Sequence, residues 1–230
     1  MGHASQGQIL TLFEMLIFCP PRIFSHNFDV LKMFGCAPRS SFPHTTSTTL
    51  WPVQSEFESG MSWRIQSYTQ VSRQLSTLKN ILNGGNVFVI GIPVYDGNIL
   101  PNGGNDVHDG YRNGYVISGG HALAIVGYDD DLSYTNSSGG TSYGAFKAIN
   151  SWGSTWDGDG YIWLSYDFVI NGLGDYGEAY TMVDRTNYQP LAWMRFNITH
   201  PARKQIATYL GVGNPSSPNF NVANAIYLRG

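Results

Sequence analysis

Residues 119–128 read GGHALAIVGY, and residues 143–153 read YGAFKAINSWG. Each stretch contains an apolar run with β-branched and aromatic residues, which predicts two strands, His121–Tyr128 and Tyr143–Asn150. The polar, glycine-containing stretch between them, Asp129–Ser142, predicts the loop of a hairpin. The prediction of the rest of the fold starts from this hairpin.

The hairpin brings a histidine and an asparagine together. If Tyr128 pairs with Tyr143, then His121 pairs with Asn150, and both side chains point to the same face of the sheet. A neutral carboxamide can accept a hydrogen bond from one imidazole nitrogen, fix the tautomer and leave the other nitrogen free to take a proton. Such a pair suits a cysteine nucleophile, because the thiolate supplies the negative partner for the imidazolium. From spacing alone, His121 is also compatible with a buried strand-end histidine, and Asn150 with a turn residue.

Four motifs follow one another along the chain: Gly119-Gly120-His121-Ala122-Leu123, Asn150-Ser151-Trp152-Gly153, Trp156, and Gly160-Tyr161-Ile162. In this order and at these separations, they resemble the papain family of cysteine peptidases. The resemblance extends from about Leu31 to Asp184 and implies hydrolysis of peptide bonds by acyl transfer to a cysteine.

The resemblance also implies a role for individual residues. His121 would be the general acid and base, Asn150 would orient it, and Trp152 would shield the hydrogen bond between them from water. Four further residues match positions that contact the substrate in this family: Phe42, Pro43, Gly120 and Ala122. Phe42, Pro43 and Ala122 would shape the pocket for the substrate side chain next but one to the cut, and Gly120 would border the leaving-group side.

The nucleophile is the part of the family pattern that this sequence lacks. The family carries its cysteine in a Gln-Gly-x-Cys-Gly-Ser-Cys-Trp context, and no such string occurs here. The two cysteines are Cys19, which precedes two prolines, and Cys36, which lies in a predicted loop. Because the histidine and asparagine usually follow the nucleophile by roughly 130–150 residues, we expect the nucleophile to precede Met1. We therefore expect a chain that is inactive alone, with a non-catalytic papain-like binding module as the alternative.

The predicted fold class is α+β. It corresponds to a papain-like two-lobed fold, mainly the β-barrel lobe with remnants of the helical lobe, and with a β-rich C-terminal extension. Helices are predicted over Ser25–Phe34, where Ser25 is the N-cap, and over Thr69–Asn83, where apolar residues recur every three or four positions. The run Val87–Tyr95 predicts a central strand.

Three segments are expected along the chain. Residues 1–24 are an atypical N-terminal segment. Residues 25–186 form an incomplete papain-like peptidase domain. Residues 187–230 are the beginning of a β-rich accessory domain, because short apolar–polar alternations and a turn cluster replace the earlier pattern.

Composition excludes several classes of function. The net charge is −3, and only 13% of the 230 residues are charged, so no basic field exists to attract nucleic acid. The apolar run Gln8–Phe18 is too short to span a bilayer, and no positive residue precedes it as a signal peptide would require. Two cysteines are too few for a disulfide scaffold.

No metal or cofactor is expected. The loop Asn102–Asp109 carries Asp106, His108 and Asp109, but its composition is typical of a solvated loop. The run Asp157–Gly160 lacks the distal glutamate of a calcium loop and predicts a tight turn. The expected partner is a peptide or protein substrate, and a missing N-terminal segment is a further expected partner. The family resemblance favours an extracellular or lytic compartment.

Overall fold

The computed structural model describes residues 24–38, 40–42, 52–95, 107–110, 116–174, 177–185, 198–199, 201–202, 207–213 and 220–227. The chain divides into two units, Met1–Gln189 and Pro190–Gly230, and each is described by itself. The described part of the first unit combines one large sheet with a few short helices. The predicted α+β class is confirmed.

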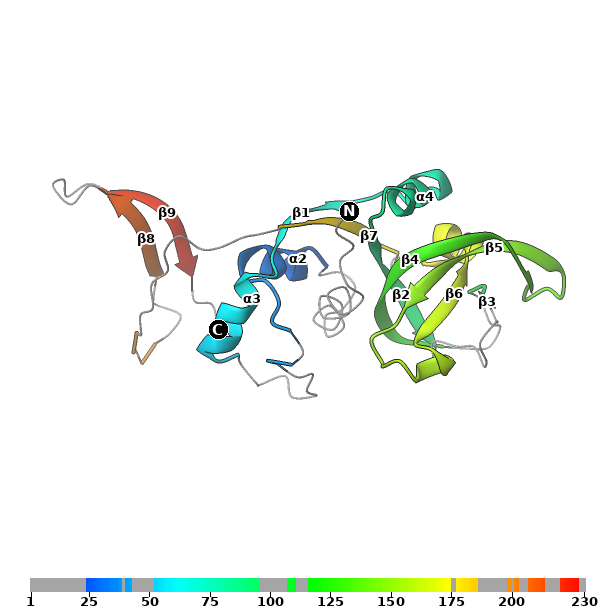
Figure 1. Cartoon of the computed structure of the whole chain (residues 1–230), viewed down its shortest axis with the longest axis horizontal. Coiled ribbons are helices and arrows are strands. Elements are labelled where there is room, and N and C mark those ends of the chain that lie inside the picture. Colours follow the sequence, from blue (N-terminus) through cyan, green and yellow to red (C-terminus); the bar gives the residue numbers. More distant parts are fainter. Residues whose placement is uncertain are drawn as a thin grey trace. The chain divides into compact units, whose positions relative to one another are not determined.

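The helical elements of the first unit are α2 (Phe24–Met33), α3 (Gln54–Met61), α4 (Leu75–Asn83), the 3-10 turn η2 (Trp156–Gly158) and the π-helical turn η3 (Phe168–Gly172). Its strands are β1 (Ile65–Gln70), β2 (Phe88–Tyr95), β3 (Val107–His108), β4 (Ile117–Thr135), β5 (Thr141–Ile149), β6 (Tyr161–Ser165) and β7 (Ala179–Asp184). They form a seven-stranded sheet in the order β1-β7-β2-β4-β5-β6-β3 (Figure 1). Neighbouring strands are antiparallel, except that β3 runs parallel to β6.

The central strands are buried on both faces of the sheet. In β4, Leu123 and Ile125 belong to one hydrophobic cluster, whereas Ala122 and Ala124 belong to another. Because side chains alternate between faces along a strand, the two clusters cover opposite faces of this part of the sheet. β2 lies between β7 and β4, which confirms the prediction that Val87–Tyr95 is a central strand.

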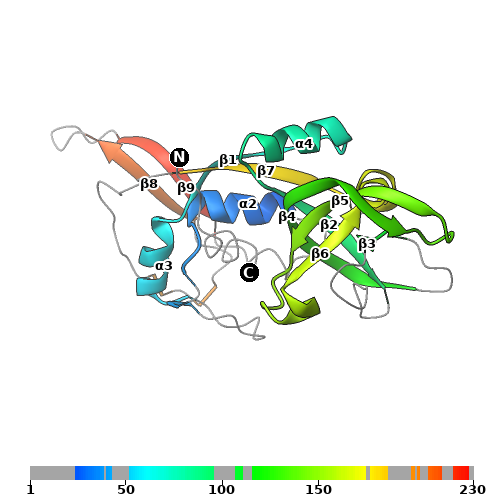
Figure 2. The same ribbon diagram turned by 45° about the vertical axis from the view of Figure 1, so that its right-hand side comes forward.

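Helix α2 packs beside β1 and β7 through one apolar face (Figures 1 and 2). Phe28 and Leu31 are buried, and the helix is followed by Gly35 at a φ of 77°, a left-handed conformation that glycine adopts without strain. The predicted Ser25 cap is wrong, because the helix already includes Phe24 and Ser25 lies inside its first turn.

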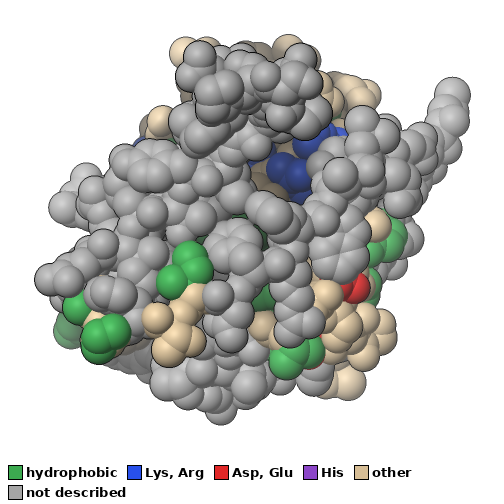
Figure 3. Space-filling model, turned by 90° about the vertical axis from the view of Figure 1, so that its left-hand side faces the viewer, with side chains coloured by type: hydrophobic (Ala, Val, Ile, Leu, Met, Phe, Trp, Pro, Cys, Tyr) green, Lys and Arg blue, Asp and Glu red, His purple; other side chains and the backbone are tan. Residues whose placement is uncertain are grey.

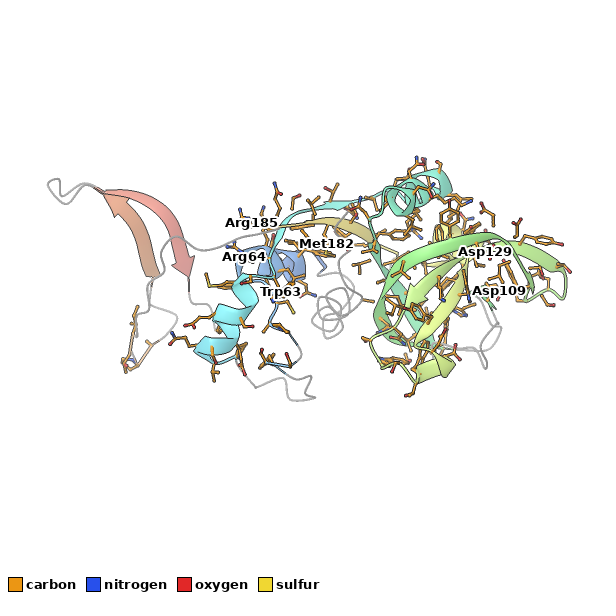
Figure 4. All side chains as sticks on the ribbon, viewed as in Figure 1. Trp63, Arg64, Asp109, Asp129, Met182 and Arg185 are labelled. Carbon is orange, nitrogen blue, oxygen red and sulfur yellow. The ribbon has the colours of Figure 1, made fainter. Side chains whose placement is uncertain are left out.

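The guanidinium of Arg64 fastens this helix to the sheet. Its Nε and Nη2 groups both donate to the carbonyl oxygen of Lys32, in the last turn of α2. The backbone N–H of Arg185 donates to the Arg64 carbonyl, so the ends of β1 and β7 meet at this point (Figure 4). On the face drawn in Figure 3, the hydrophobic side chains of described residues stand at several separate places.

The predicted helix Thr69–Asn83 begins too early. Thr69 and Gln70 lie in β1, where Thr69 pairs with Thr181 of β7, and α4 begins only at Leu75. The apolar spacing was compatible with a longer helix, but ladder hydrogen bonds with a distant strand override local helix propensity here.

The register of the β4–β5 hairpin also differs from the prediction. Tyr128 pairs with Phe146 rather than with Tyr143, and Ala124 pairs with Ile149. Two irregularities interrupt the pairing. The first, between Ile125 and Gly127, lies between the two pairs just named, and the second, between Asp129 and Ser133, lies between both pairs and the tip of the hairpin. Each bulge adds residues to one strand without a partner in the other, and a sequence pattern with period two does not reveal such additions.

Two predicted loops contain strand residues. β4 continues to Thr135 and β5 begins at Thr141, so most of Asp129–Ser142 belongs to the hairpin strands. Within the predicted loop Asn102–Asp109, residues Val107–His108 form β3, which pairs with β6.

In the described part of the second unit, β8 (Ala207–Gly213) and β9 (Phe220–Tyr227) form an antiparallel two-stranded sheet. Across the residues that the structure describes, no helix is both long and apolar enough to cross a membrane.

Candidate active site

The sheet brings His121 and Asn150 together. His121 lies in β4 opposite Ile92 of β2, and its side chain is 7% exposed. Asn150 directly follows β5 and is 1% exposed, and its backbone N–H donates to the Gly160 carbonyl oxygen at 2.9 Å. Both residues are therefore held by main-chain pairing near the same end of the hairpin.

The two side chains are hydrogen-bonded, with His121 Nε2 2.9 Å from Asn150 Oδ1. Near this site the hairpin is offset by two residues from the predicted register, since Ala124 pairs with Ile149 rather than Lys147. An even offset keeps every side chain on its predicted face. His121 and Asn150 therefore share a face and meet diagonally, although they are not directly opposite each other.

This bond selects one tautomer of the imidazole. The oxygen of a carboxamide can only accept, so Nε2 carries the proton and donates it to Asn150. The lone pair of the neutral ring is then on Nδ1, which is the nitrogen that can take a proton from a nucleophile.

Burial lowers the pKa of His121 below its ordinary value of 6.5, and the hydrogen bond to Asn150 opposes this effect in part. The imidazole is therefore neutral at pH 7, the protonation state that a base requires.

Trp152 lies against the imidazole, with ring centroids 4.9 Å apart and planes 37° apart. The indole is itself 45% exposed, and Trp156 meets it edge to face at 5.5 Å. This contact places an apolar ring against one face of the imidazole. The structure thus brings together His121, Asn150 and Trp152.

Comparison with known proteins identifies the family to which this chain belongs. The family model for papain family cysteine proteases matches residues 22–176, more than half of the chain. This chain belongs to the papain family. No curated protein sequence matches it.

Solved papain-family structures share the fold. Xylellain, a cysteine protease from Xylella fastidiosa, has a TM-score of 0.53 at 19% identity, and the alignment covers 76% of this chain and 68% of xylellain. The clostridial cysteine protease Cwp84, in a form obtained after propeptide cleavage, has a TM-score of 0.52 at 19% identity, covering 68% of this chain and 39% of that chain. Digestive procathepsin L 3 from the larval midgut of Tenebrio molitor has a TM-score of 0.50 at 19% identity, and the alignment covers 68% of this chain and 47% of that chain. At these identities the likeness establishes the papain-like fold, and the chain spans less than half of the last two proteins.

The turn after Asn150 contains a residue in a left-handed backbone conformation. Asp157 has a φ of 48°, in the left-handed region that favours glycine. Aspartate is among the few other residues that tolerate this region, so the turn keeps its shape. The N–H of Gly160 donates to the Trp156 carbonyl at 2.6 Å, and the segment forms the predicted tight turn.

The residues predicted to contact substrate fall in two places. Gly120 and Ala122 flank His121 in β4, and Ala122 is 5% exposed within the hydrophobic cluster that also includes Phe28 of α2. Phe42 is half-buried, and its N–H donates to the Pro38 carbonyl at 3.0 Å. Pro43 lies outside the described residues. No contact of a substrate with these four positions is tested, so their roles remain predictions.

Cys36 is placed as a core residue. Its side chain is 4% exposed, it packs in the same cluster as Leu31 and Ile65, and its Sγ donates to the Ala37 carbonyl at 3.5 Å. A thiol packed among apolar side chains is typical of a structural cysteine rather than of a reactive one. Cys19, the second cysteine of the sequence, lies outside the described residues.

The carboxylates of Asp109 and Asp129 accept hydrogen bonds from backbone N–H groups. Asp109 accepts the N–H of Ser137, and Asp129 Oδ1 accepts the N–H groups of Asp131 and Leu132 (Figure 4). Asp106 lies outside the described residues. In the part of the chain that the structure describes, no three His, Cys, Asp or Glu side chains gather in a way that would hold a metal ion.

Two main-chain contacts of the site were missed by sequence reasoning, the carbonyl of Gly160 and the N–H of Ser151. Both hold Asn150. Sequence motifs identify side chains, whereas every residue except proline has a backbone N–H. A main-chain donor therefore cannot be recognised from the residue type.

Proposed function

We propose that this chain carries the imidazole–amide part of a cysteine peptidase that hydrolyses peptide bonds. The observation that supports the proposal is the buried 2.9 Å bond from His121 Nε2 to Asn150 Oδ1, with the Trp152 ring against the imidazole. In this role His121 is the general acid and base, and Asn150 orients it. The peptidase domain would span residues 25–186, followed by an accessory domain over 187–230.

The chemistry follows from the free Nδ1 lone pair. His121 takes the proton of a cysteine thiol, and the thiolate attacks the carbonyl carbon of the scissile peptide bond. The imidazolium then protonates the leaving nitrogen as the C–N bond breaks, which leaves a thioester. Water attacks the thioester while His121 takes its proton, and the returned proton restores the thiol as the acid product leaves.

The thiol of this reaction would come from outside the described residues. Cys36 is buried and bonded to a carbonyl, and the family's Gln-Gly-x-Cys-Gly-Ser-Cys-Trp string does not occur in the sequence. The same string carries the glutamine that completes the family's oxyanion hole, so the present chain would lack both groups. We propose that it does not hydrolyse peptides by itself.

The test combines labelling with activity. The full chain and its Cys19→Ser, Cys36→Ser and His121→Gln variants are treated with a thiol-directed epoxide inhibitor, and labelled cysteines are located by mass spectrometry. In parallel, hydrolysis of fluorogenic peptides is measured, and the nucleotide sequence upstream of Met1 is read in all frames. We expect no labelling, no hydrolysis and an upstream Gln-Gly-x-Cys-Gly-Ser-Cys-Trp equivalent.

Other outcomes contradict specific parts of the proposal. Labelling of Cys19 that is lost in Cys19→Ser and His121→Gln but kept in Cys36→Ser would make Cys19 the nucleophile. That result would overturn the expected inactivity while supporting the peptidase. No labelling together with no upstream motif in any frame would contradict the peptidase, and saturable peptide binding without hydrolysis would then favour a non-catalytic binding module.

A further inference from the structure

We infer that the backbone N–H of Ser151 is a positioning group, because it determines which end of the Asn150 carboxamide faces His121. This inference rests on the proposed function and deepens it, because it concerns how the histidine acquires its tautomer. The group involved belongs to the main chain of the residue after the asparagine.

The oxygen of Asn150 receives two hydrogen bonds. His121 Nε2 lies 2.9 Å from Oδ1, and the backbone N–H of Ser151 donates to the same oxygen at 2.8 Å. A backbone N–H can only donate, so the atom 2.8 Å from it must be the acceptor end of the amide.

The other end of the amide contributes nothing to its orientation. Asn150 Nδ2 is buried and has no hydrogen-bond partner among the described residues. Asn150 is also 1% exposed, so bulk water cannot hold the amide from outside. Within the described part of the chain, the two bonds to Oδ1 are what distinguishes the observed orientation from the flipped one.

Flipping the amide would reverse the chemistry of the pair. Nδ2 would then face both the imidazole and the Ser151 N–H, and two donors would oppose each other. Nδ2 would also donate to Nε2 of His121, which requires the imidazole proton on Nδ1. That nitrogen could then no longer take a proton from a thiol. The Ser151 N–H therefore excludes the tautomer that cannot act as the base at Nδ1.

The side chain of residue 151 is not needed for this role. The Oγ atom of Ser151 is buried and has no hydrogen-bond partner in the described part of the chain. Any residue with a backbone N–H meets the requirement, and proline alone lacks this donor. The position should therefore tolerate alanine and reject proline.

The first test measures hydrogen exchange of the Ser151 amide by NMR in the full chain. We compare the wild type with Asn150→Leu, which removes the acceptor at similar volume, and with His121→Phe, which keeps a ring under Trp152 but cannot hydrogen-bond. The Ser151 amide should exchange at least an order of magnitude faster in Asn150→Leu and within a few-fold of the wild type in His121→Phe. Unchanged exchange in Asn150→Leu, or protection lost in His121→Phe, would overturn the inference.

The second test reads the tautomer directly. Nitrogen-15 NMR of the histidine rings identifies the protonated nitrogen of His121 in Ser151→Ala and Ser151→Pro. We expect Nε2–H in the wild type and in Ser151→Ala, and a mixture with Nδ1–H in Ser151→Pro. A pure Nε2–H form in a folded Ser151→Pro would refute the role. If that variant does not fold, the exchange comparison decides. Neither test requires hydrolysis, so both remain decisive even if the proposed peptidase activity fails.

Discussion

His121 is buried among apolar and aromatic groups, and this environment decides its protonation. Burial penalises the imidazolium, and the hydrogen bond to Asn150 compensates only partly, so the pKa is lowered. Residue types and period-two alternation in the sequence predicted that His121 and Asn150 share a face. They did not predict the depth of burial, because burial depends on packing partners far away in the sequence.

The first prediction concerns the pH dependence of stability. Because the folded-state pKa of His121 is below its ordinary value of 6.5, the unfolded chain binds a proton at a higher pH than the folded chain does. The free energy of unfolding should therefore fall as the pH drops below about 6.5, and it should carry no such contribution above it. His121→Gln removes this titration, so the difference in unfolding free energy, variant minus wild type, should rise on acidification.

Urea denaturation at a series of pH values from about 8 to about 5 measures this difference, and the other histidines cancel in the comparison. Curves of the wild type and His121→Gln that stay parallel over the whole range would show that the imidazole does not titrate differently in the folded chain.

The second prediction uses two aspartates of one turn. Asp157 has a φ of 48°, whereas Asp159 has a φ of −139° and its Oδ1 accepts the N–H of Tyr161 at 2.9 Å. Asp157→Gly relieves the left-handed strain and should raise the unfolding free energy by up to about 1 kcal/mol. Asp159→Gly loses a hydrogen bond and adds chain freedom, so it should lower that energy by about 1 kcal/mol. Chemical denaturation that gives both changes the same sign would contradict this account.

At the scale of elements, the β4–β5 hairpin shows why the site could be predicted although its register could not. The two bulges shift the partners of β4 along β5. A glycine lies at each of them, Gly127 in β4 and Gly144 in β5, and a glycine inside a strand often marks a bulge, but it does not tell how many residues the bulge adds. Because the shift near Ala124 is even, His121 and Asn150 keep their common face. The helix α4 was likewise found from its apolar spacing, but its start was not, since β1 is held by pairing with β7.

The third prediction concerns how this hairpin packs on the following segment. Gly144 of β5 has a φ of 85°, and a Cβ there would lie 2.3 Å from the ring of Tyr166. Gly144→Ala should lower the unfolding free energy by more than about 2 kcal/mol, because it adds overpacking to backbone strain. Gly139, in the tip of the hairpin, has a φ of 82° and nothing within 4 Å of a Cβ.

Gly139→Ala is therefore the matched control. It carries the backbone strain alone and should cost about 1 kcal/mol. Equal losses in the two variants, measured by urea denaturation, would mean that the contact with Tyr166 does not restrict residue 144.

At the scale of the whole molecule, the described hydrophobic clusters lie within the first unit, Met1–Gln189. The family and fold were recognisable from motifs that surround one hairpin, because those motifs combine the reacting side chains with the turns that hold them. The domain limits 25–186 and 187–230 rest on a change in the sequence pattern alone and stay predictions. The motifs around this hairpin also do not locate the cysteine nucleophile, which the papain family carries in a different segment.

The fourth prediction concerns the independence of the first unit. A chain ending at Gln189 should unfold within a few degrees of the full chain, because both hydrophobic clusters and the His121–Asn150 bond belong to residues before that point. Calorimetry of the two chains measures this, with the 15N signal of the His121 ring as a check on the site. A much lower Tm for the shorter chain would show that residues 190–230 contribute to the stability of the first unit.

The bulges in β4 have a practical consequence for engineering. They separate the pairs that hold His121 and Asn150 from the tip of the hairpin, where the Asn136 N–H donates to the Gly140 carbonyl. A fluorophore-binding loop or an epitope tag inserted between Asn136 and Gly140 would lengthen the distal end only. The hairpin tip is thus a site for grafting that leaves the spacing of the reacting groups intact.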